Sequence, residues 1–502
     1  MPLLLGLDIG TSSAKAVLFD PESAGIVAVA GREYPVLKPA PDRAEQEPQT
    51  WWQAVVSATQ EVIAAARRTD VAAISFSGQM HGTVLLDAAG EPLGPAIIWA
   101  DQRSAAECEA LTAVLGPERY AGLAGTLPAV GFMGATLLWL ARHEPERLAR
   151  THRVVFPKDY VRLHMTGRIA TEVSDAASSG VFDIAGRRWA TPILAAVGLP
   201  EEIFPEVLES SAVAGTLLPE AAAELGLAAG IPVIAGCADQ PAQAIGNGLL
   251  GPGMASVTTG SGGQVFVPVA AGDGRIATDP RLHVFIHAVP GVNYVLGAIL
   301  SAGLSLRWLR DLTGLSGTPG AYALLSQEAS AIPPGANGLI FLPYLAGERT
   351  PHMDPAARGA FIGLSHYHTR GHLARAVMEG VAFALRQALQ ISLGLGGSAS
   401  VIIAAGGGAE SAVWRQIQAD VFGLPLRQTL LVEQAGVGAA LLAGVGAGIY
   451  PSFAAACAQV VRLGPETAPL PDHQAIYQAL YEQFTGLYPL LKADFHRLAG
   501  RG

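Results

Sequence analysis

Cysteine is scarce in this sequence, and the features of a secreted protein are missing. The 502 residues include three cysteines, Cys108, Cys237 and Cys457, an odd number at positions far apart. This usage argues against a framework of disulfide bonds and fits a reducing compartment. The opening segment lacks a basic region, and its apolar run reaches Asp8 too soon for a signal peptide. We therefore expect a cytoplasmic protein.

Long apolar runs and basic runs are also missing. The longest apolar candidate, residues 435–449, has fifteen residues, whereas a bilayer requires about 20. We expect a buried helix there and no membrane span. Charged residues make up 15% of the chain, and 32 Lys and Arg against 42 Asp and Glu give a net charge of −10. This balance argues against nucleic acid and anionic membranes as partners.

Apolar residues are abundant instead. They make up 50% of the chain, which excludes intrinsic disorder. A single hydrophobic core stops growing at about 250–300 residues. The length of 502 residues therefore predicts two large domains.

The first eighty residues predict a mixed α/β sheet. Residues 3–20 contain an apolar run, a Gly-Thr-Ser turn and a second apolar run, which is typical of a β-hairpin. Residues 26–30 and 71–76 predict two further strands. Between them, Thr50 is the expected N-cap of a helix through Ala66, because apolar side chains recur there at helical spacing. Antiparallel strands followed by helix–strand alternation indicate a mixed sheet.

The same opening recurs in residues 254–267, so we interpret the chain as an internal repeat. Residues 246–253 are rich in glycine and proline and form the natural boundary. We expect two domains, 1–246 and 252–455, followed by a helical segment, 456–502. Two domains facing each other would leave a cleft, where ligand sites are common.

Both repeats turn at glycines and small hydroxyl residues. Such a turn presents several backbone N–H groups to an anion such as phosphate, although it also suits an ordinary hairpin. Neither turn matches a Walker A or dinucleotide-binding motif. Two such turns opening two halves favour phosphate binding. The residues are Gly10, Thr11 and Ser12 in the first turn and Gly260 and Ser261 in the second.

Two acidic residues are candidates for chemistry. Asp8 interrupts an apolar strand, where a carboxylate is costly unless it is paired or binds a cation. It suits a cap of the following turn, but we favour a role in holding the magnesium that accompanies a nucleotide. Asp239 follows the apolar strand 232–236 and precedes a helix. It is either the N-cap of that helix or a base that accepts a proton from a substrate hydroxyl.

Three loops carry further candidates. Gln79 and His81 follow a strand and suit hydrogen bonding to a polyhydroxy substrate, although a histidine in such a loop is often purely structural. Three glycines, residues 406–408, lie between a strand and a helix and allow either a flat ligand or a plain turn. The third loop offers a planar ring, an acid and a base that suit a sugar pocket, namely Trp99, Asp101 and Arg103.

In combination, these motifs resemble the FGGY-type carbohydrate kinases, within the fold group of actin, hexokinase and the heat-shock ATPases. The similarity extends from residue 6 to about 448. Within the family, Gln-Met-His-Gly and Pro-Lys-Asp-Tyr most resemble xylulose kinases. The motifs are Asp-Ile-Gly-Thr-Ser (8–12), Ser-Gly-Gln-Met-His-Gly (77–82), Pro-Lys-Asp-Tyr (157–160), Ser-Asp-Ala-Ala (174–177), Gly-Cys-Ala-Asp-Gln (236–240), Leu-Ala-Gly-Glu-Arg-Thr-Pro (345–351) and Gly-Gly-Gly-Ala (406–409).

The resemblance implies an α/β fold of two ribonuclease-H-like domains with a central cleft that holds a sugar, ATP and Mg²⁺. It places the sugar and the catalytic base in the N-terminal domain and the nucleotide in the C-terminal one. Asp239 is then the general base, and Asp8 lies near magnesium and phosphate. The residues assigned to the sugar are Gln79, Met80, His81, Asp101, Arg103 and Gln240. Those assigned to the nucleotide are Gly10, Thr11, Ser12, Gly260, Ser261, Gly407 and Gly408.

The resemblance to xylulose kinases predicts phosphorylation of D-xylulose to D-xylulose 5-phosphate. Two departures touch the sugar side: Gln240 stands where xylulose kinases commonly have Asn, and the segment around Trp99 is similar to gluconate kinases. A kinase for gluconate or another ketose or polyol is therefore one alternative. A nucleotide-binding regulator without a small acceptor is another. The sequence leaves the oligomeric state open, with a homodimer as one candidate.

Overall fold

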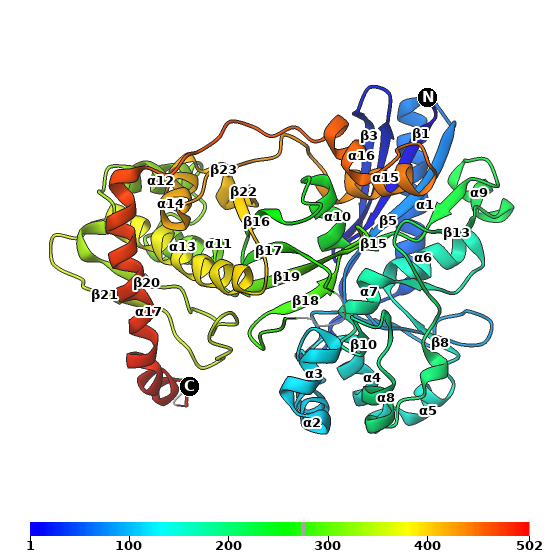
Figure 1. The fold of residues 1–502 in the computed structure, drawn as a ribbon, viewed down its shortest axis with the longest axis horizontal. Coiled ribbons are helices and arrows are strands. Elements are labelled where there is room, and N and C mark those ends of the chain that lie inside the picture. Colours follow the sequence, from blue (N-terminus) through cyan, green and yellow to red (C-terminus); the bar gives the residue numbers. More distant parts are fainter. Residues whose placement is uncertain (273–276, 501–502) are drawn as a thin grey trace.

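Two halves, each built on one mixed sheet, make up the molecule (Figure 1). The computed structural model describes residues 1–272 and 277–500. The N-terminal sheet has the strand order β13-β14-β5-β1-β2-β3, and β15 also pairs with β5. Its strands are β1 (Leu3–Ile9), β2 (Ser13–Asp20), β3 (Gly25–Glu33), β5 (Val71–Gly78), β13 (Val213–Thr216), β14 (Pro232–Ile234) and β15 (Cys237–Ala238).

The second sheet repeats the plan of the first. Strand β16 pairs with β17 in an antiparallel hairpin and with β22 in parallel, just as β1 pairs with β2 and β5. The internal repeat expected from the sequence is therefore confirmed in the topology. The strand order is β18-β19-β17-β16-β22-β23. The strands are β16 (Gly253–Thr259), β17 (Gly263–Ala270), β18 (His283–Ile286), β19 (Val292–Ile299), β22 (Ala399–Ala405) and β23 (Leu426–Arg427).

Helices cover both sheets. Those of the first half are α1 (Pro48–Ala66), α2 (Ala105–Leu115), α3 (Pro117–Ala124), α4 (Met133–His143), α5 (Pro145–Ala149), α6 (Pro157–Thr166), α7 (Val173–Ser178), α8 (Thr191–Val197), α9 (Pro219–Leu225) and α10 (Asp239–Gly246). Those that follow in sequence are α11 (Gly303–Leu312), α12 (Ala321–Ser330), α13 (Arg370–Gly394), α14 (Ala412–Phe422), α15 (Gln434–Gly446), α16 (Phe453–Val460) and α17 (Pro471–Ala499).

In the part of the chain that the structure describes, short strands form five two-stranded sheets outside the main ones. Among them, β20 and β21 flank the loop of the Leu-Ala-Gly-Glu-Arg-Thr-Pro motif. The strands are β4 (Glu45–Gln46), β6 (Val84–Leu86), β7 (Ala96–Ile97), β8 (Arg153–Val155), β9 (Thr171–Glu172), β10 (Phe182–Asp183), β11 (Arg188–Trp189), β12 (Val207–Leu208), β20 (Ile340–Leu342) and β21 (Ala360–Ile362).

Helix α1 begins earlier than the sequence pattern predicts. Its first residue is Pro48 and its N-cap is Glu47, whereas Thr50 was the expected cap. Proline suits the first helical position because it has no N–H to leave unpaired. The Thr50 hydroxyl instead donates to the carbonyl oxygen of Glu47 at 2.6 Å.

Helix α15 is the buried helix expected near residue 440, but it packs on the first sheet and not on the second (Figure 1). A Cβ on Gly6 of β1 would overlap the carbonyl oxygen of Gly436, and one on Gly438 would overlap that of Ala242 in α10. Glycines therefore let the helix lie directly against the strand and α10. Phe453 of α16 joins the same apolar cluster as Leu4 of β1. The packing therefore departs from the expected domain 252–455, because α15 and α16 return to the first half.

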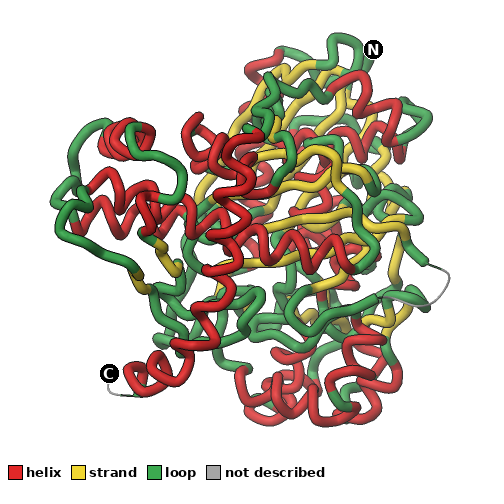
Figure 2. The backbone as a smooth tube through the Cα atoms, turned by 60° about the vertical axis from the view of Figure 1, so that its left-hand side comes forward, coloured by secondary structure: helices red, strands yellow, loops and turns green. Residues whose placement is uncertain are grey.

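Helix α17 packs on the C-terminal half. Figure 2 shows it lying across the other helices of that half. Its aromatic side chains Tyr477, Phe484 and Tyr488 belong to the core cluster of the second sheet, and the helix occupies most of the helical segment expected at 456–502. None of the helices in residues 1–272 and 277–500 combines the length and apolarity needed to cross a membrane.

Candidate active site

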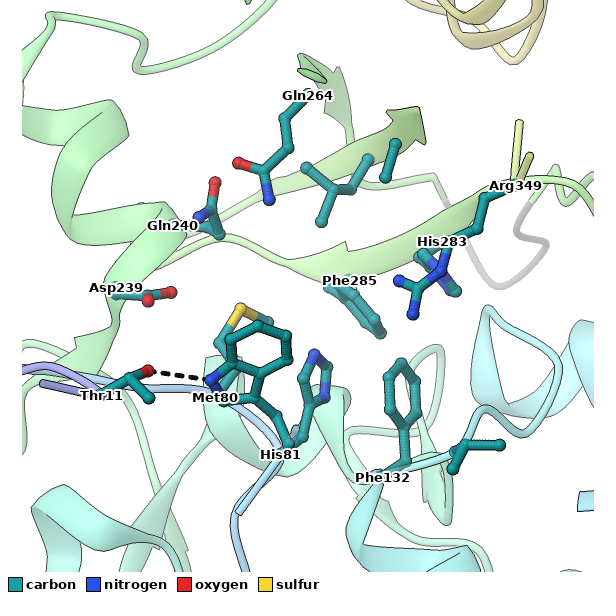
Figure 3. A pocket seen from close by; sticks show the side chains of 14 residues that line it. Thr11, Met80, His81, Phe132, Asp239, Gln240, Gln264, His283, Phe285 and Arg349 are labelled. Carbon is teal, nitrogen blue, oxygen red and sulfur yellow. Dashed lines mark hydrogen bonds between the residues drawn. The ribbon is translucent and has the colours of Figure 1, made fainter. Parts of the chain in front are cut away.

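A cavity of about 190 Å³ lies between the two halves and contains the predicted base (Figure 3). A cavity of this size suits a small ligand, because pockets for larger organic ligands are typically about 300–1,000 Å³. The N-terminal half contributes Thr11, Met80, His81, Trp99, Val130, Phe132, Asp239 and Gln240. The C-terminal half contributes Gln264, His283, Phe285, Leu296, Ala298 and Arg349.

Asp239 is placed by β15 and α10. The strand ends at Ala238, which is the N-cap residue of α10, and Asp239 is the first residue of the helix. The residue is half-buried; its Oδ1 is buried and has no hydrogen-bond partner within the described residues. Burial, with a smaller contribution from the charge of Asp8, raises its pKa to about 7. A carboxylate with this pKa is suited to accept a proton near neutral pH.

Asp8 lies on β1 and is not among the residues that line the cavity. Its carboxylate accepts a hydrogen bond from the Ser77 hydroxyl at 2.7 Å. Burial is the main cause that raises its pKa, and the hydrogen bond from Ser77 opposes it. Lys15 lies opposite Asp8 in the hairpin register and forms an ion pair with Glu433 at 2.7 Å.

The turn after β1 has its carbonyl groups occupied. The carbonyl oxygen of Gly10 accepts the Tyr34 hydroxyl at 2.6 Å, and that of Thr11 accepts the side-chain amide of Gln46 at 2.7 Å. The backbone N–H of Tyr34 donates to the carbonyl of Ser12 at 3.1 Å. In the part of the chain that the structure describes, the N–H groups of Thr11 and Ser12 have no intramolecular acceptor. They are therefore available to an anion, and their contact with phosphate stays a prediction.

His81 and Met80 line the cavity, and their contact with the sugar stays a prediction. The His81 ring lies 3.9 Å from the Phe132 ring, nearly parallel to it. Its Nδ1 is 2.7 Å from the carbonyl oxygen of Ser178, and because a carbonyl only accepts, Nδ1 carries the proton. Burial lowers the pKa of His81 to about 4, so the ring is neutral and its Nε2 is a hydrogen-bond acceptor.

Three residues assigned to the sugar do not reach the cavity. Gln79 is buried, and its amide donates to Gln46 at 2.8 Å. Asp101 and Arg103 form a buried ion pair at 2.7 Å, and the Arg103 guanidinium lies over the Trp139 ring. Their charges satisfy each other inside the protein. Trp99, from the same segment, lines the cavity instead and donates to the Thr11 hydroxyl at 2.8 Å.

A buried ionic cluster lies close to β15, the strand that ends just before Asp239. The Lys158 ammonium is within 2.9 Å of Asp159, 3.3 Å of Glu172 and 2.8 Å of Asp175. All four side chains are fully buried. The sequence offered their motifs only as family signatures. Charged residues inside otherwise apolar segments were the available signal for a buried network.

The cluster forms hydrogen bonds with the backbone just before Asp239. The Ser174 hydroxyl donates to Glu172 at 2.8 Å and accepts the N–H of Ala238 at 3.0 Å. The Arg162 guanidinium donates to the carbonyl oxygen of Ala235 at 2.6 Å. Because these partners are themselves fixed by ion pairs, the position of Asp239 is determined by the interior of the domain.

A second cavity, of about 490 Å³, gathers the glycines assigned to the nucleotide. A Cβ on Gly408 would lie 2.5 Å from a methyl carbon of Thr259, whereas one on Gly407 would meet nothing within 4 Å. Gly407 therefore borders open space. The lining residues include Gly260, Ser261, Gly407 and Gly408 together with Gly303, Leu306, Arg307, Tyr322, Ser326, Ser411 and Trp414.

Sequence reasoning missed the contribution of the C-terminal half to the first cavity. Gln264 follows the second glycine turn, so the repeat with the first turn was a usable signal. Arg349 lies in a motif quoted without a role. His283 and Phe285 lie on β18, and nothing in their local sequence marks them.

Comparison with known proteins agrees with this geometry. Residues 3–246 match the N-terminal domain model of the FGGY family of carbohydrate kinases, and residues 255–447 match its C-terminal domain model. The chain is 38% identical to the xylulose kinase of Escherichia coli (strain K12), over 97% of this chain and 99% of that protein.

Two further relatives bear on the fold and the substrate. The crystal structure of xylulose kinase from Rhodospirillum rubrum is 33% identical, has a TM-score of 0.92, and is matched over 98% of this chain and 100% of that one. The gluconokinase of Bacillus subtilis (strain 168) is 28% identical, over 99% of this chain and 97% of that protein. The expected fold, two α/β domains of the actin and hexokinase type, is confirmed. The chain belongs to the FGGY family of carbohydrate kinases.

Proposed function

We propose that this chain is an ATP-dependent xylulose kinase that forms D-xylulose 5-phosphate. The observation that carries the proposal is a carboxyl group of near-neutral pKa, Asp239, in a small cavity between the two halves. Similarity over the whole chain to xylulose kinases, at 38% and 33% identity, supports the substrate. The lower identity of 28% to a gluconokinase favours xylulose over gluconate.

Asp239 acts as the general base in this proposal. Its carboxylate accepts the proton of the C5 hydroxyl while that oxygen attacks the γ-phosphorus of ATP. The bond from phosphorus to the leaving oxygen of ADP breaks as the new bond forms. General-base assistance is typically worth about 10²–10⁴-fold in rate. The raised pKa of Asp239 suits the task, because a carboxylate of ordinary pKa is a weaker base.

The sugar lies against the remaining wall of the first cavity. His81 offers an acceptor nitrogen to a hydroxyl, and Met80 and Phe132 offer apolar surface to the carbon chain. Gln240 lines the cavity beside Asp239 and presents an amide where many xylulose kinases have a shorter one. Discrimination among sugars then depends on which hydroxyl groups find a hydrogen-bond partner in the site, because an unpaired polar group in a closed site is costly.

Nucleotide and magnesium belong to the same proposal. The N–H groups of Thr11 and Ser12 suit the phosphates, and the second cavity suits the rest of ATP. Within the described residues no three acidic, histidine or cysteine side chains form a metal cage. Mg²⁺ in kinases needs only one or two carboxylates beside phosphates and water, and Asp8 fits as such a carboxylate. Bound there, Mg²⁺ would neutralise phosphate charge.

The two halves divide these tasks in the proposed scheme. Residues 1–246, joined by α15 and α16, carry the base and most of the sugar wall, and the rest of residues 252–455 carry the nucleotide cavity. A cavity built around a base argues against a regulator that has no small acceptor. The homodimer and the cytoplasmic location stay predictions, for which light scattering and cell fractionation are the tests.

A coupled assay of ADP release tests the proposal with D-xylulose, L-xylulose, D-ribulose, gluconate and glycerol as acceptors. We expect the highest kcat/KM with D-xylulose. Release of ADP without any acceptor should be far slower, because closure of the cleft excludes water. A clear preference for gluconate would overturn the xylulose assignment, and acceptor-independent ATP hydrolysis at the same rate would overturn the kinase assignment.

A further inference from the structure

Arg349 faces the cavity from the C-terminal half, across from Asp239 (Figure 3). It lies in the loop between β20 and β21, and its guanidinium group points into the cavity. Arg349 is exposed, and within residues 1–272 and 277–500 its hydrogen bonds are made by its backbone and not by its guanidinium group. The positive charge is therefore available to a ligand.

The backbone on either side of Arg349 is fixed. Glu348 is buried, and its Oε1 accepts the N–H of Arg349 at 2.8 Å and that of Leu300 at 2.9 Å. Thr350 is also buried, and its N–H donates to the carbonyl oxygen of Ala298 at 3.0 Å. Both contacts attach the loop to the end of β19. The base of the Arg349 side chain is thus held in place before any ligand binds.

A second set of bonds fixes the loop from the other side. Glu348 and Asp354 exchange two backbone hydrogen bonds, at 2.9 and 2.8 Å. The Asp354 carboxylate accepts the Tyr488 hydroxyl of α17 at 2.6 Å. The closing helix of the C-terminal half therefore supports the loop that carries Arg349.

Within residues 1–272 and 277–500, Arg349 is the single positive charge among the residues that line the cavity, and Asp239 is the single acid. The two histidines of the lining are neutral: burial, with a smaller contribution from Arg349, lowers the pKa of His81 to about 4 and that of His283 to about 3. The cavity is thus acidic at one end and basic at the other. A ligand with a carboxylate at one end is attracted by Arg349 and repelled by an ionised Asp239, so it has one favoured orientation.

We propose that Arg349 is a specificity-determining residue, whose guanidinium binds the oxygen-bearing end of the substrate opposite to the hydroxyl that faces Asp239. It follows that the site also binds five-carbon sugar acids, with the carboxylate on Arg349. This inference rests on the proposed function, because it assumes that the first cavity holds the sugar. A ligand that contacts both Asp239 and Arg349 is held by both halves of the molecule.

Equilibrium binding of two matched probes tests the inference without turnover. D-xylonate and xylitol share the five-carbon chain and differ at C1, where one has a carboxylate and the other a hydroxymethyl group. We expect isothermal titration calorimetry on the intact chain at pH 8 to give about tenfold to a hundredfold tighter binding of xylonate, as for a charge-assisted hydrogen bond. In Arg349→Met the preference should fall to about twofold or less.

Arg358→Met is the matched control. Arg358 lies in the same loop, donates within the described residues only to the carbonyl oxygens of Pro355 and Ala357, and is not among the described residues that line the cavity. This variant should keep the full preference for xylonate. Titration with ATP verifies that each variant is folded, and Arg349→Gln replaces the methionine variant if that one fails to bind ATP.

Two results would overturn the inference. One is a wild-type chain that binds xylonate no more tightly than xylitol, which needs no variant. The other is a preference that persists in a folded Arg349→Met or Arg349→Gln chain. Neither result coincides with failure of the proposed function, which is decided by phosphorylation of D-xylulose in the coupled assay.

Discussion

The negative charge of Asp8 adds to burial in raising the pKa of the Asp239 carboxyl group. Strand β5 brings the two acids together: Ser77 pairs with Asp8 of β1 on one side and with Cys237 of β15 on the other. Because parallel strands end at the same edge of a sheet, residues far apart in sequence share one site. The proton affinity of the proposed base is therefore set by a neighbouring acid as well as by its surroundings.

Removal of the carboxylate of Asp239 should slow phosphoryl transfer. We expect Asp239→Ala to lower kcat by about 10²–10⁴-fold, because the acceptor hydroxyl loses its base. The KM values for sugar and ATP should change far less. Steady-state kinetics measure both, and a variant with near-normal turnover would show that another group is the base.

Activity should depend on pH through the same group. A general base works only when deprotonated, and the pKa of Asp239 is raised to about 7. We expect kcat/KM to fall as the pH drops below about 7 and to level off above it. In Asp8→Asn, where the neighbouring charge is gone, the midpoint of the residual activity should move to lower pH. An unchanged midpoint would show that the charge of Asp8 does not influence the pKa of Asp239.

Stability should respond to pH in the opposite sense. The pKa of Asp239 is higher in the folded chain than its ordinary value of 3.8, so the folded state binds more protons between about pH 4 and 7. The carboxyl group then costs stability as the pH rises through this window, and the cost is complete above about pH 7. Asp239→Asn removes this cost, so above about pH 7 it should raise the free energy of unfolding by at most about 4 kcal/mol. Thermal unfolding should give a higher Tm than wild type at pH 8 and a much smaller difference at pH 4.

The hydroxyl group of Ser174 should matter for turnover although it lies outside the cavity. Ser174→Ala removes the acceptor of the Ala238 N–H, and a misplaced base costs rate more than affinity. We expect kcat to fall about threefold to thirtyfold with the KM for ATP unchanged. Ser178→Ala is the matched control, because that hydroxyl is equally buried on α7 but donates to the nearby carbonyl of Asp175. Equal effects in the two variants would indicate general loosening of α7.

The sequence predicts the parts of this molecule that are encoded locally. The glycine turns and the strand before Asp239 have their pattern within a few residues, so their positions could be predicted. Arg349 and His283 could not be, because only the packing of the second half against the first brings them to the cavity. Asp101 and Arg103 were assigned to the sugar because charges in a loop suggest a ligand. Their geometry lets them neutralise each other, which no spacing rule reveals.

The open space beside Gly407 allows a side chain to be added in the nucleotide cavity without straining the backbone. A Cβ at this position meets no atom within 4 Å, so Gly407→Val should fold and project its side chain into the cavity. We expect the KM for ATP to rise about tenfold or more, because the methyl groups occupy volume that the nucleotide needs. Calorimetric binding of xylitol in the absence of ATP should be unchanged. Gly486→Val, at an exposed helical glycine with equally open surroundings, is the control and should leave both values as in the wild type. A nucleotide that fills this cavity would meet the added side chain. An unchanged KM for ATP in Gly407→Val would therefore place the nucleotide outside the cavity.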